Sequence, residues 1–193
     1  PSDVVVGGNR LFISDLKSHS VLVYDKAKLE LLHSIPQNST TADASSRLYS
    51  PVNLTLDTQG RLYVSDLGAF RVQQYDSEGR YLRTFGYGAG DKPGQFSRPK
   101  GVAVDREGRV YVVDAGAQVV QIFDAEGRLL MFFGEMRGKT PGLYLPAKVY
   151  IDYEHVEHFQ SYAAPGFHLE YLVLVTSQFG DRKVSVFGFG HNN

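Results

Sequence analysis

Cysteine is absent from the 193 residues of this chain. Its absence excludes disulfide bonds, thiolate zinc sites, cysteine nucleophiles and covalent haem attachment through a Cys-x-x-Cys-His motif. The chain also has no run of about 18 apolar residues, the length that a transmembrane helix needs. The formal net charge of −1 gives no general attraction to nucleic acid. What remains, with 20 glycines and 12% aromatic residues, is a composition typical of a globular domain of strands and turns.

The chain is built on an internal repeat. Segments 51–66 and 99–114 both contain a Pro, a short apolar strand, Asp-x-x-Gly-Arg, a second strand and a closing Asp. A worn copy occupies 1–15, and a fourth copy follows the third. Asp57 and Asp105 are 105 − 57 = 48 residues apart, which indicates one supersecondary unit copied along the chain. We therefore treat the chain as one domain with repeats at 1–50, 51–98, 99–145 and 146–193.

Each repeat predicts four short antiparallel strands. In the third repeat these cover 101–104, 109–113, 120–123 and 129–133. β-branched and aromatic residues between Asp/Gly turns predict an all-β fold. A four-stranded unit with a period of about 40–50 residues is typical of a propeller blade, which buries its two apolar faces against neighbouring blades.

The repeated residues also resemble a known family. Four segments of the third repeat are similar to the NHL repeat: Pro99-Lys-Gly-Val-Ala-Val-Asp105, Val110-Tyr-Val-Val-Asp114, Val120-Gln-Ile-Phe-Asp124 and Phe133-Gly134. The resemblance covers all four repeats and is closest over 51–134. It implies an NHL-type β-propeller, typically of six blades, with interaction functions. The third repeat lacks the Arg that the family carries before the third strand, where the second repeat has Arg71.

The fourth repeat shows no fourth strand after 184–187, so we expect the last blade to lack its own outer strand. This pattern predicts a partial or open propeller of a longer parent. Because unpaired edge strands associate readily, we expect a missing N-terminal segment or another chain to cover the open edge. A closed four-bladed ring is the alternative.

An insertion at about 153–168 interrupts the fourth repeat between its first and second strands. Glu154, His155 and His158 stand close together there and are weak candidates for a metal site. Zinc needs three or four ligands, however, and the His-Glu-x-x-His order of metalloproteases is absent. Only His168 is available as a further ligand.

The other interpretation of the insertion is a short amphipathic helix. It would lay Val156, Phe159 and Tyr162 on the rim of the propeller and end at 165–166, with its charged residues facing water. We favour this helix over a metal site, and we expect no cofactor.

Asp15, Asp66 and Asp114 each end the second strand of their repeat. A ring of carboxylates on one face could bind a cation. We favour the interpretation that each Asp caps its own loop by accepting backbone N–H bonds. The fourth repeat has 176–177, Thr-Ser, at this place, which breaks such a ring. The Asp-x-x-Gly turns supply too few oxygen ligands for a calcium loop.

The loops between second and third strands share one face of a propeller with the connections between blades. In this chain they are rich in Lys, Arg and Phe, whereas most acids fall on turns of the opposite face. Such a face can hold an acidic partner. The predicted partner-binding residues are Phe70, Arg71, Phe96, Arg98, Arg137, Lys139, Phe179, Arg182 and Lys183.

Three classes of function compete. A non-catalytic protein-interaction scaffold is favoured, because scaffold signals are strong and no Gly-x-Ser-x-Gly nucleophile motif occurs. The first alternative is a metal-dependent propeller hydrolase or lyase. The second is an RNA-binding NHL module, although nucleic acid is a poor match to the neutral net charge.

The segment from Ile151 to Phe189 resembles the ending of NHL propellers from bacteria rich in multihaem c-type cytochromes. This resemblance implies an exported accessory to extracytoplasmic electron-transfer proteins, in the periplasm or at the cell surface. Its partner would then be an acidic protein or a cytochrome. A cytoplasmic location is the alternative.

Overall fold

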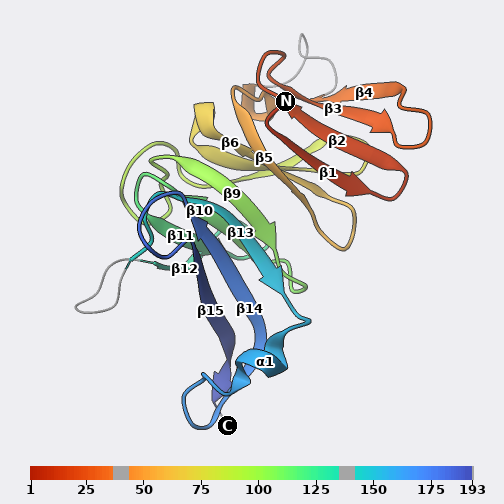
Figure 1. Cartoon of the computed structure of the whole chain (residues 1–193). Helices are drawn as coiled ribbons and strands as arrows, with labels where there is room; N and C mark the ends of the chain where they lie inside the picture. Colours follow the sequence, from red (N-terminus) through yellow and green to blue (C-terminus); the bar gives the residue numbers. More distant parts are fainter. Residues whose placement is uncertain (37–43, 135–141, 193) are drawn as a thin grey trace.

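The computed structural model describes residues 1–36, 44–134 and 142–192. The described chain forms four antiparallel sheets, here called blades 1 to 4, which follow one another around an arc (Figure 1). Blade 1 contains β1 (Asp3–Gly7), β2 (Arg10–Asp15), β3 (Ser20–Asp25) and β4 (Leu31–Ile35). Blade 2 contains β5 (Pro51–Leu56), β6 (Leu62–Asp66), β7 (Arg71–Tyr75) and β8 (Tyr81–Phe85). Blade 3 contains β9 (Pro99–Val104), β10 (Val110–Asp114), β11 (Val119–Phe123) and β12 (Leu129–Phe133).

Blade 4 is a three-stranded sheet of β13 (Pro146–Asp152), β14 (Phe167–Ser177) and β15 (Val184–Asn192). The described part of the chain gives it no fourth strand, as the sequence predicts. The single α-helix of the described residues, α1 (Val156–Gln160), lies between β13 and β14. Short 3-10 turns occur at Ala44–Ser46 and Leu67–Ala69. What covers the outer edge of β15 stays a prediction.

The Asp-x-x-Gly-Arg turns fix the register of the hairpins. In the turn after β9, Asp105 Oδ1 accepts the N–H groups of Glu107 at 2.9 Å and Arg109 at 2.8 Å, and Gly108 adopts φ +84°. A residue with a Cβ is strained at that φ, so glycine suits this position. The Nε of Arg109 donates to Asp105 Oδ2 at 2.5 Å. The turns that begin at Asp57, Asp76 and Asp124 repeat this set of bonds.

Each pair of consecutive blades encloses an apolar cluster. We call the side of a blade that faces the preceding blade its leading face, and the side that faces the next blade its trailing face. Between blades 1 and 2, the trailing residues Val21 and Val23 meet the leading residues Leu54 and Leu62. Similar clusters join blade 2 to blade 3 and blade 3 to blade 4. Alternate residues of a strand point to opposite faces of its sheet. A blade with a neighbour on each side therefore carries apolar residues at both sets of positions.

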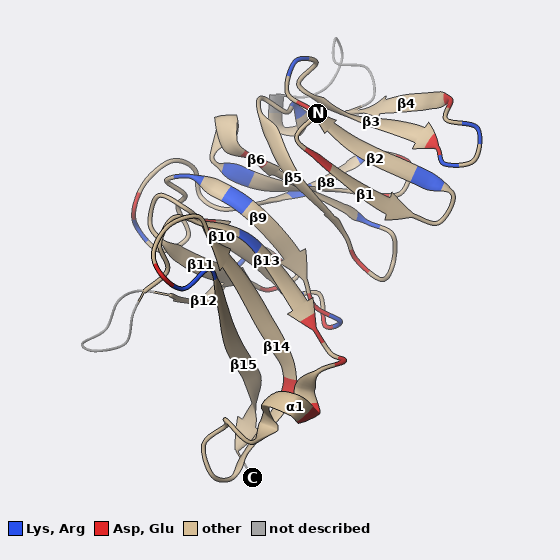
Figure 2. Ribbon diagram, viewed as in Figure 1, with Lys and Arg blue, Asp and Glu red and all other residues tan. Residues whose placement is uncertain are grey.

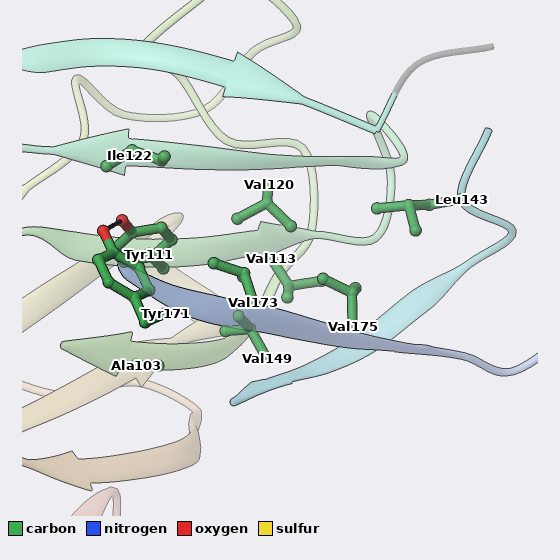
Figure 3. Packing of buried hydrophobic residues seen from close by; sticks show 10 residues of the cluster. All are labelled: Ala103, Tyr111, Val113, Val120, Ile122, Leu143, Val149, Tyr171, Val173 and Val175. Carbon is green, nitrogen blue, oxygen red and sulfur yellow. Dashed lines mark hydrogen bonds between the residues drawn. The ribbon is translucent and has the colours of Figure 1, made fainter. Parts of the chain in front are cut away.

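The cluster between blades 3 and 4 has a pair of hydrogen-bonded tyrosine hydroxyls at one end (Figure 3). The hydroxyls of Tyr111 and Tyr171 lie 2.5 Å apart, and Tyr171 donates to Asp105 Oδ2 at 3.1 Å. The guanidinium of Arg109 lies 4.4 Å from the centroid of the Phe189 ring. Buried polar groups stabilise an interface only when they are paired, and these are.

The arc is open, so the alternative of a closed four-bladed ring is wrong. Apolar clusters join blades 1 to 2, 2 to 3 and 3 to 4, whereas blade 1 and blade 4 stand at opposite ends of the arc (Figure 1). Their innermost strands are linked by an ion pair between Lys148 Nζ and Asp3 Oδ2, at 3.0 Å. Asp3 also accepts the side-chain amide of Asn53 at 2.7 Å, and Asn53 accepts the N–H of Val102 at 3.0 Å. These bonds run from blade to blade along the inner strands.

The insertion forms only the five-residue helix α1, which ends at Gln160 and not at 165–166 as predicted. Val156 and Phe159 are partly buried, but Tyr162 is 79% exposed, so its predicted place on the packed side of the helix is wrong. The helix ends before Tyr162, whose ring lies 6.1 Å from that of Phe159 but faces solvent. No helix among the described residues is long and apolar enough to cross a membrane.

Candidate partner-binding surface

Buried aspartates hold the loop face in place. Asp66 is fully buried and accepts the N–H groups of Tyr49 and Ser50, which directly precede β5. Burial raises the pKa of Asp66, although these two hydrogen bonds oppose the shift. These bonds tie the end of β6 to the segment that leads into the first strand of its own blade.

Asp114 does the same in blade 3. Its carboxylate accepts the N–H groups of Ser97 and Arg98 at 2.7 and 2.8 Å, and those of Gly116 and Ala117 at 3.0 and 3.2 Å. The prediction that such an Asp caps its own loop is confirmed for Asp114, through Gly116 and Ala117. Asp66 and Asp114 in addition accept N–H groups from the segment before the first strand of their blade, which the sequence did not predict.

The end blades have weaker versions of this cap. Asp15 is 25% exposed and accepts the Ser18 hydroxyl at 2.7 Å and the Lys17 N–H at 3.2 Å. The hydrogen bond from Ser18 is the main cause of the lowered pKa of Asp15. In blade 4, Ser177 Oγ replaces the carboxylate and accepts the Tyr144 N–H at 3.3 Å.

Five residues form what we call the loop-face patch: Arg98, Lys100, Phe179, Arg182 and Lys183. Lys100 and Lys183 meet at Gln178, since Lys100 Nζ donates to its Oε1 at 3.4 Å and Lys183 Nζ to its backbone oxygen at 3.2 Å. Burial is the main cause of the lowered pKa of Lys100. The positive charge of Arg98 is the second cause, which indicates that the two cations lie close enough to repel each other.

Phe179 is the aromatic residue of the patch. Its side chain is 65% exposed, and its N–H donates to the Tyr144 oxygen at 3.3 Å. Arg182 and Lys183 are exposed in the same loop, and Arg98 is exposed just before β9. The patch therefore joins the start of blade 3 to the β14–β15 loop of blade 4, two segments about eighty residues apart in the sequence.

The prediction that Phe96 contacts a partner is wrong. Its ring is fully buried between blades 2 and 3 and lies 5.8 Å from the ring of Phe123. The backbone of Gly86 lies directly against this ring. A Cβ added at Gly86 would come within 2.4 Å of Phe96 Cε2, so only glycine fits there. The connection between the two blades folds back into the core at this point, which an apolar residue in a loop does not reveal by itself.

Phe70 and Arg71 also serve the interior. Phe70 adopts φ +54° and packs partly against the cluster between blades 2 and 3. Arg71 is 17% exposed and donates from Nη2 to the Arg47 oxygen at 2.6 Å, with its Nε 3.9 Å from Asp66. The Arg71 contacts tie the start of β7 to the segment before β5, whereas Phe70 packs inward, so both residues offer little surface to a partner. Arg137 and Lys139 lie outside the described residues.

The weak metal candidates do not converge. His155 Nδ1 lies 2.7 Å from Asp152 Oδ2, and the His158 ring packs on Phe159 with centroids 5.1 Å apart. Glu154 is exposed. Within 1–36, 44–134 and 142–192, no group of three or more His, Asp or Glu side chains could hold a metal ion.

Sequence reasoning missed two features of the surface. Lys100 stands on the first strand of blade 3, where repetition suggested scaffold, yet it belongs to the patch. The second is a charge division: no Lys or Arg occurs between Val149 and Asp181, and the acids near α1 gather at the far end of blade 4 (Figure 2). A count of charges along the sequence could have found the second feature.

Comparison with known proteins supports this architecture. The sequence profile described as the NHL repeat matches residues 96–123. No curated protein matches the sequence. The chain carries an NHL repeat on a β-propeller fold.

Solved structures with the same fold are distant in sequence. A streptogramin B lyase shares 11% identity over 94% of this chain and 51% of its own, with a TM-score of 0.55. The Kuenenia stuttgartiensis hydrazine synthase shares 16% over 94% and 43%, with a TM-score of 0.60. The Staphylococcus aureus virginiamycin B lyase shares 12% over 96% and 54%, with a TM-score of 0.55. This chain therefore spans about half the length of these propellers, and the likeness shows the fold alone.

Proposed function

We propose that this protein is a non-catalytic scaffold that binds an acidic protein partner through the loop-face patch. The observation that carries the proposal is the exposed ring of Phe179 in the β14–β15 loop, which also exposes Arg182 and Lys183 and is joined through Gln178 to Lys100 of blade 3. Exposed aromatic and arginine side chains are the residue types that dominate the energy of protein interfaces.

The patch is held in shape before a partner arrives. Asp114 fixes the backbone of Arg98, and Gln178 receives both Lys100 and Lys183. A surface that is already ordered loses less conformational entropy on binding. Its positive charge speeds the encounter with an acidic surface and makes the affinity depend on salt.

The proposed partner is an acidic c-type cytochrome or another extracytoplasmic electron-transfer protein, and the proposed location is the periplasm or the cell surface. The resemblance of 151–189 to propellers from cytochrome-rich bacteria supports this part of the proposal. So does the similarity in fold to a hydrazine synthase. The chain itself has no Cys for covalent haem, so in this proposal the haem belongs to the partner.

The test compares two charge reversals of equal size. Arg98→Glu with Arg182→Glu alters the patch, whereas Lys26→Glu with Lys28→Glu alters exposed turns of the opposite face. We expect the first pair to weaken binding of an acidic c-type cytochrome by at least about tenfold in low salt, and the second pair to leave it unchanged. Haem absorbance measures the bound cytochrome, and circular dichroism checks the fold.

Equal binding by both variants, or no binding of acidic proteins by the wild type, would contradict the proposal. Two other readouts address the alternatives. Tighter binding of single-stranded RNA than of any acidic protein would favour the RNA-binding module. Zinc or calcium that copurifies in stoichiometric amounts would favour a metal-dependent hydrolase or lyase.

A further inference from the structure

The contact between blades 3 and 4 holds a partly buried ammonium group that has no counter-ion. Lys100 is the only lysine of the described residues whose side chain is not exposed. Its Nζ donates to the neutral Gln178 Oε1 at 3.4 Å, and within 1–36, 44–134 and 142–192 it forms no ion pair. By contrast, the partly buried Arg61 and Arg109 each bond an aspartate, at 2.6 and 2.5 Å. A charge held partly out of water without a counter-ion costs free energy.

The other blades show that the fold does not need this charge. Lys100 follows the proline with which its repeat begins, and the same position holds Ser2, Val52 and Ala147 in blades 1, 2 and 4. None of these three side chains is charged. Since the strand forms in every blade and the lysine occurs in one, the repeat architecture does not explain the lysine. A residue that departs from a local rule without a gain in stability indicates a functional position.

The loop of blade 4 that receives Lys100 also departs from the repeat. In blades 2 and 3 the equivalent loop contains Gly68 or Gly116, where a Cβ would lie 2.9 or 2.4 Å from a serine oxygen of the preceding segment. Blade 4 has Phe179 at this position, with its ring 65% exposed. Ser177 stands where the other blades have an aspartate, so the loop has lost a carboxylate and gained an exposed ring.

We propose that Lys100 receives an aspartate or glutamate side chain of the protein partner, whose carboxylate replaces the Gln178 amide oxygen. This inference rests on the proposed function and names the contact that gives the loop-face patch its specificity. A carboxylate supplies the counter-ion that Lys100 lacks, and a hydrogen bond between two charged groups is shorter and stronger than the present one. The Gln178 side chain is exposed, so it has room to turn away.

The charges around Lys100 favour an anion at this place. Lys and Arg lie at the start of β9 and in the β14–β15 loop, at the same end of blades 3 and 4 (Figure 2). Arg98 is close enough to contribute to the lowered pKa of Lys100, and Lys183 Nζ lies 3.2 Å from the backbone oxygen of Gln178. Asp181 is the one acid of the loop, and it is exposed. An incoming carboxylate therefore meets a surplus of positive charge, and its bond to the partly buried Lys100 is screened less by salt than a bond to an exposed cation.

The first test needs no partner. Gln178→Glu places a carboxylate at the atom that Lys100 already contacts, and it should raise the melting temperature by about 1–3 °C. In the Lys100→Met background the same substitution should give no increase, so the double-mutant cycle isolates this pair. Gln118→Glu, at an exposed glutamine of the β10–β11 loop, is the matched control and should leave the melting temperature unchanged.

The second test measures binding of an acidic c-type cytochrome by its haem absorbance. Lys100→Met and Lys92→Met each remove one positive charge, and Lys92 is exposed on the same face but outside the patch. We expect Lys100→Met to weaken binding by at least about tenfold and Lys92→Met by less than about threefold. Gln178→Glu should weaken binding as strongly as Lys100→Met, because its own carboxylate then occupies the site. Circular dichroism checks the fold of each variant.

Two results would overturn this inference and leave the proposed function standing. One is a melting temperature that Gln178→Glu leaves unchanged or raises equally in the Lys100→Met background. The other is an equal loss of cytochrome binding from Lys100→Met and Lys92→Met. A wild type that binds no acidic protein would overturn the proposed function and this inference together. Tighter binding of a tetraglutamine peptide with a free C-terminus than of a tetraglutamate peptide with both ends blocked would overturn the assignment to a side chain.

Discussion

The two central blades and the two end blades carry the same repeat but use it differently. Leu54 and Val102 are core residues in blades 2 and 3, whereas Val4 at the same position of blade 1 faces solvent. Asp114 is completely buried and accepts four backbone N–H groups, whereas Asp15 is partly exposed. The sequence position gives a residue its orientation, but the neighbouring blade decides how much that residue stabilises the fold.

The largest difference between centre and end should appear in apolar truncations. Leu54→Ala removes a side chain from the cluster between blades 1 and 2 and should lower the free energy of unfolding by about 3 kcal/mol. Val4→Ala, at the equivalent place in blade 1, should lower it by less than about 0.5 kcal/mol. Urea unfolding at low protein concentration measures both. Equal losses would show that the two faces are equally buried.

The next largest contrast concerns the aspartate caps. Asp114→Ala leaves the N–H groups of Ser97, Arg98, Gly116 and Ala117 without their acceptor, and should cost about 2–3 kcal/mol. Asp15→Ala should cost about 0.5–1 kcal/mol, because water can replace its bonds. The same denaturation measurement compares the two variants. A large loss from the Asp15 variant alone would refute this ranking.

Two arginines test the blade 3–4 contact. Arg109 is 19% exposed, pairs with the buried Asp105 and lies over the Phe189 ring, so Arg109→Ala should cost about 2 kcal/mol. Arg128 makes the same pair with Asp124 but is 74% exposed, and Arg128→Ala should cost less than about 0.5 kcal/mol. Thermal unfolding distinguishes the two. Similar melting temperatures for both variants would mean that the blade 3–4 contact does not depend on Arg109.

Alkaline pH should weaken the central blades. Burial raises the pKa of Tyr63 and Tyr111 to about 12, whereas the counterparts Phe12 and Leu174 in the end blades do not titrate. The unfolded chain loses these protons near pH 10, while the folded chain keeps them until about pH 12. The free energy of unfolding should therefore fall as pH rises from 10 to 12, by roughly 1–2 kcal/mol per tyrosine. Tyr63→Phe should reduce this loss in urea titrations at pH 9 and pH 11, and an unchanged slope would contradict the assignment.

Much of the architecture was predictable from the sequence. The period of 48 residues and the Asp-x-x-Gly turns predict four-stranded blades, and the structure confirms them. The cap that Asp114 makes on its own loop was predictable because an Asp at a strand end readily accepts nearby N–H groups. The three-stranded last blade followed from the absence of a fourth strand pattern after β15.

The candidate site was harder to predict, for physical reasons. The sequence places Phe96 in a loop between two blades. In the structure this loop folds inward, so that the Phe96 ring is buried against the backbone of Gly86. The sequence indicates an exposed cation at Arg71. In the structure its long side chain donates a hydrogen bond to the backbone oxygen of Arg47, in the segment before β5. Long-range contacts of this kind depend on how blades stack, which no local pattern contains. Lys100 joined the patch for the same reason, through Gln178 of the next blade.

The absence of cysteine permits a direct test of the contrast between end and central faces. Single-cysteine variants Val4→Cys and Val184→Cys report the open faces, and Leu54→Cys and Val72→Cys report the equivalent closed ones. Reaction with a thiol reagent under native conditions gives the accessibility of each position. At low protein concentration we predict that thiols at 4 and 184 react at the rate of an unfolded peptide, and those at 54 and 72 at least about 100-fold more slowly. Protection of all four thiols to the same extent at low concentration would contradict the account.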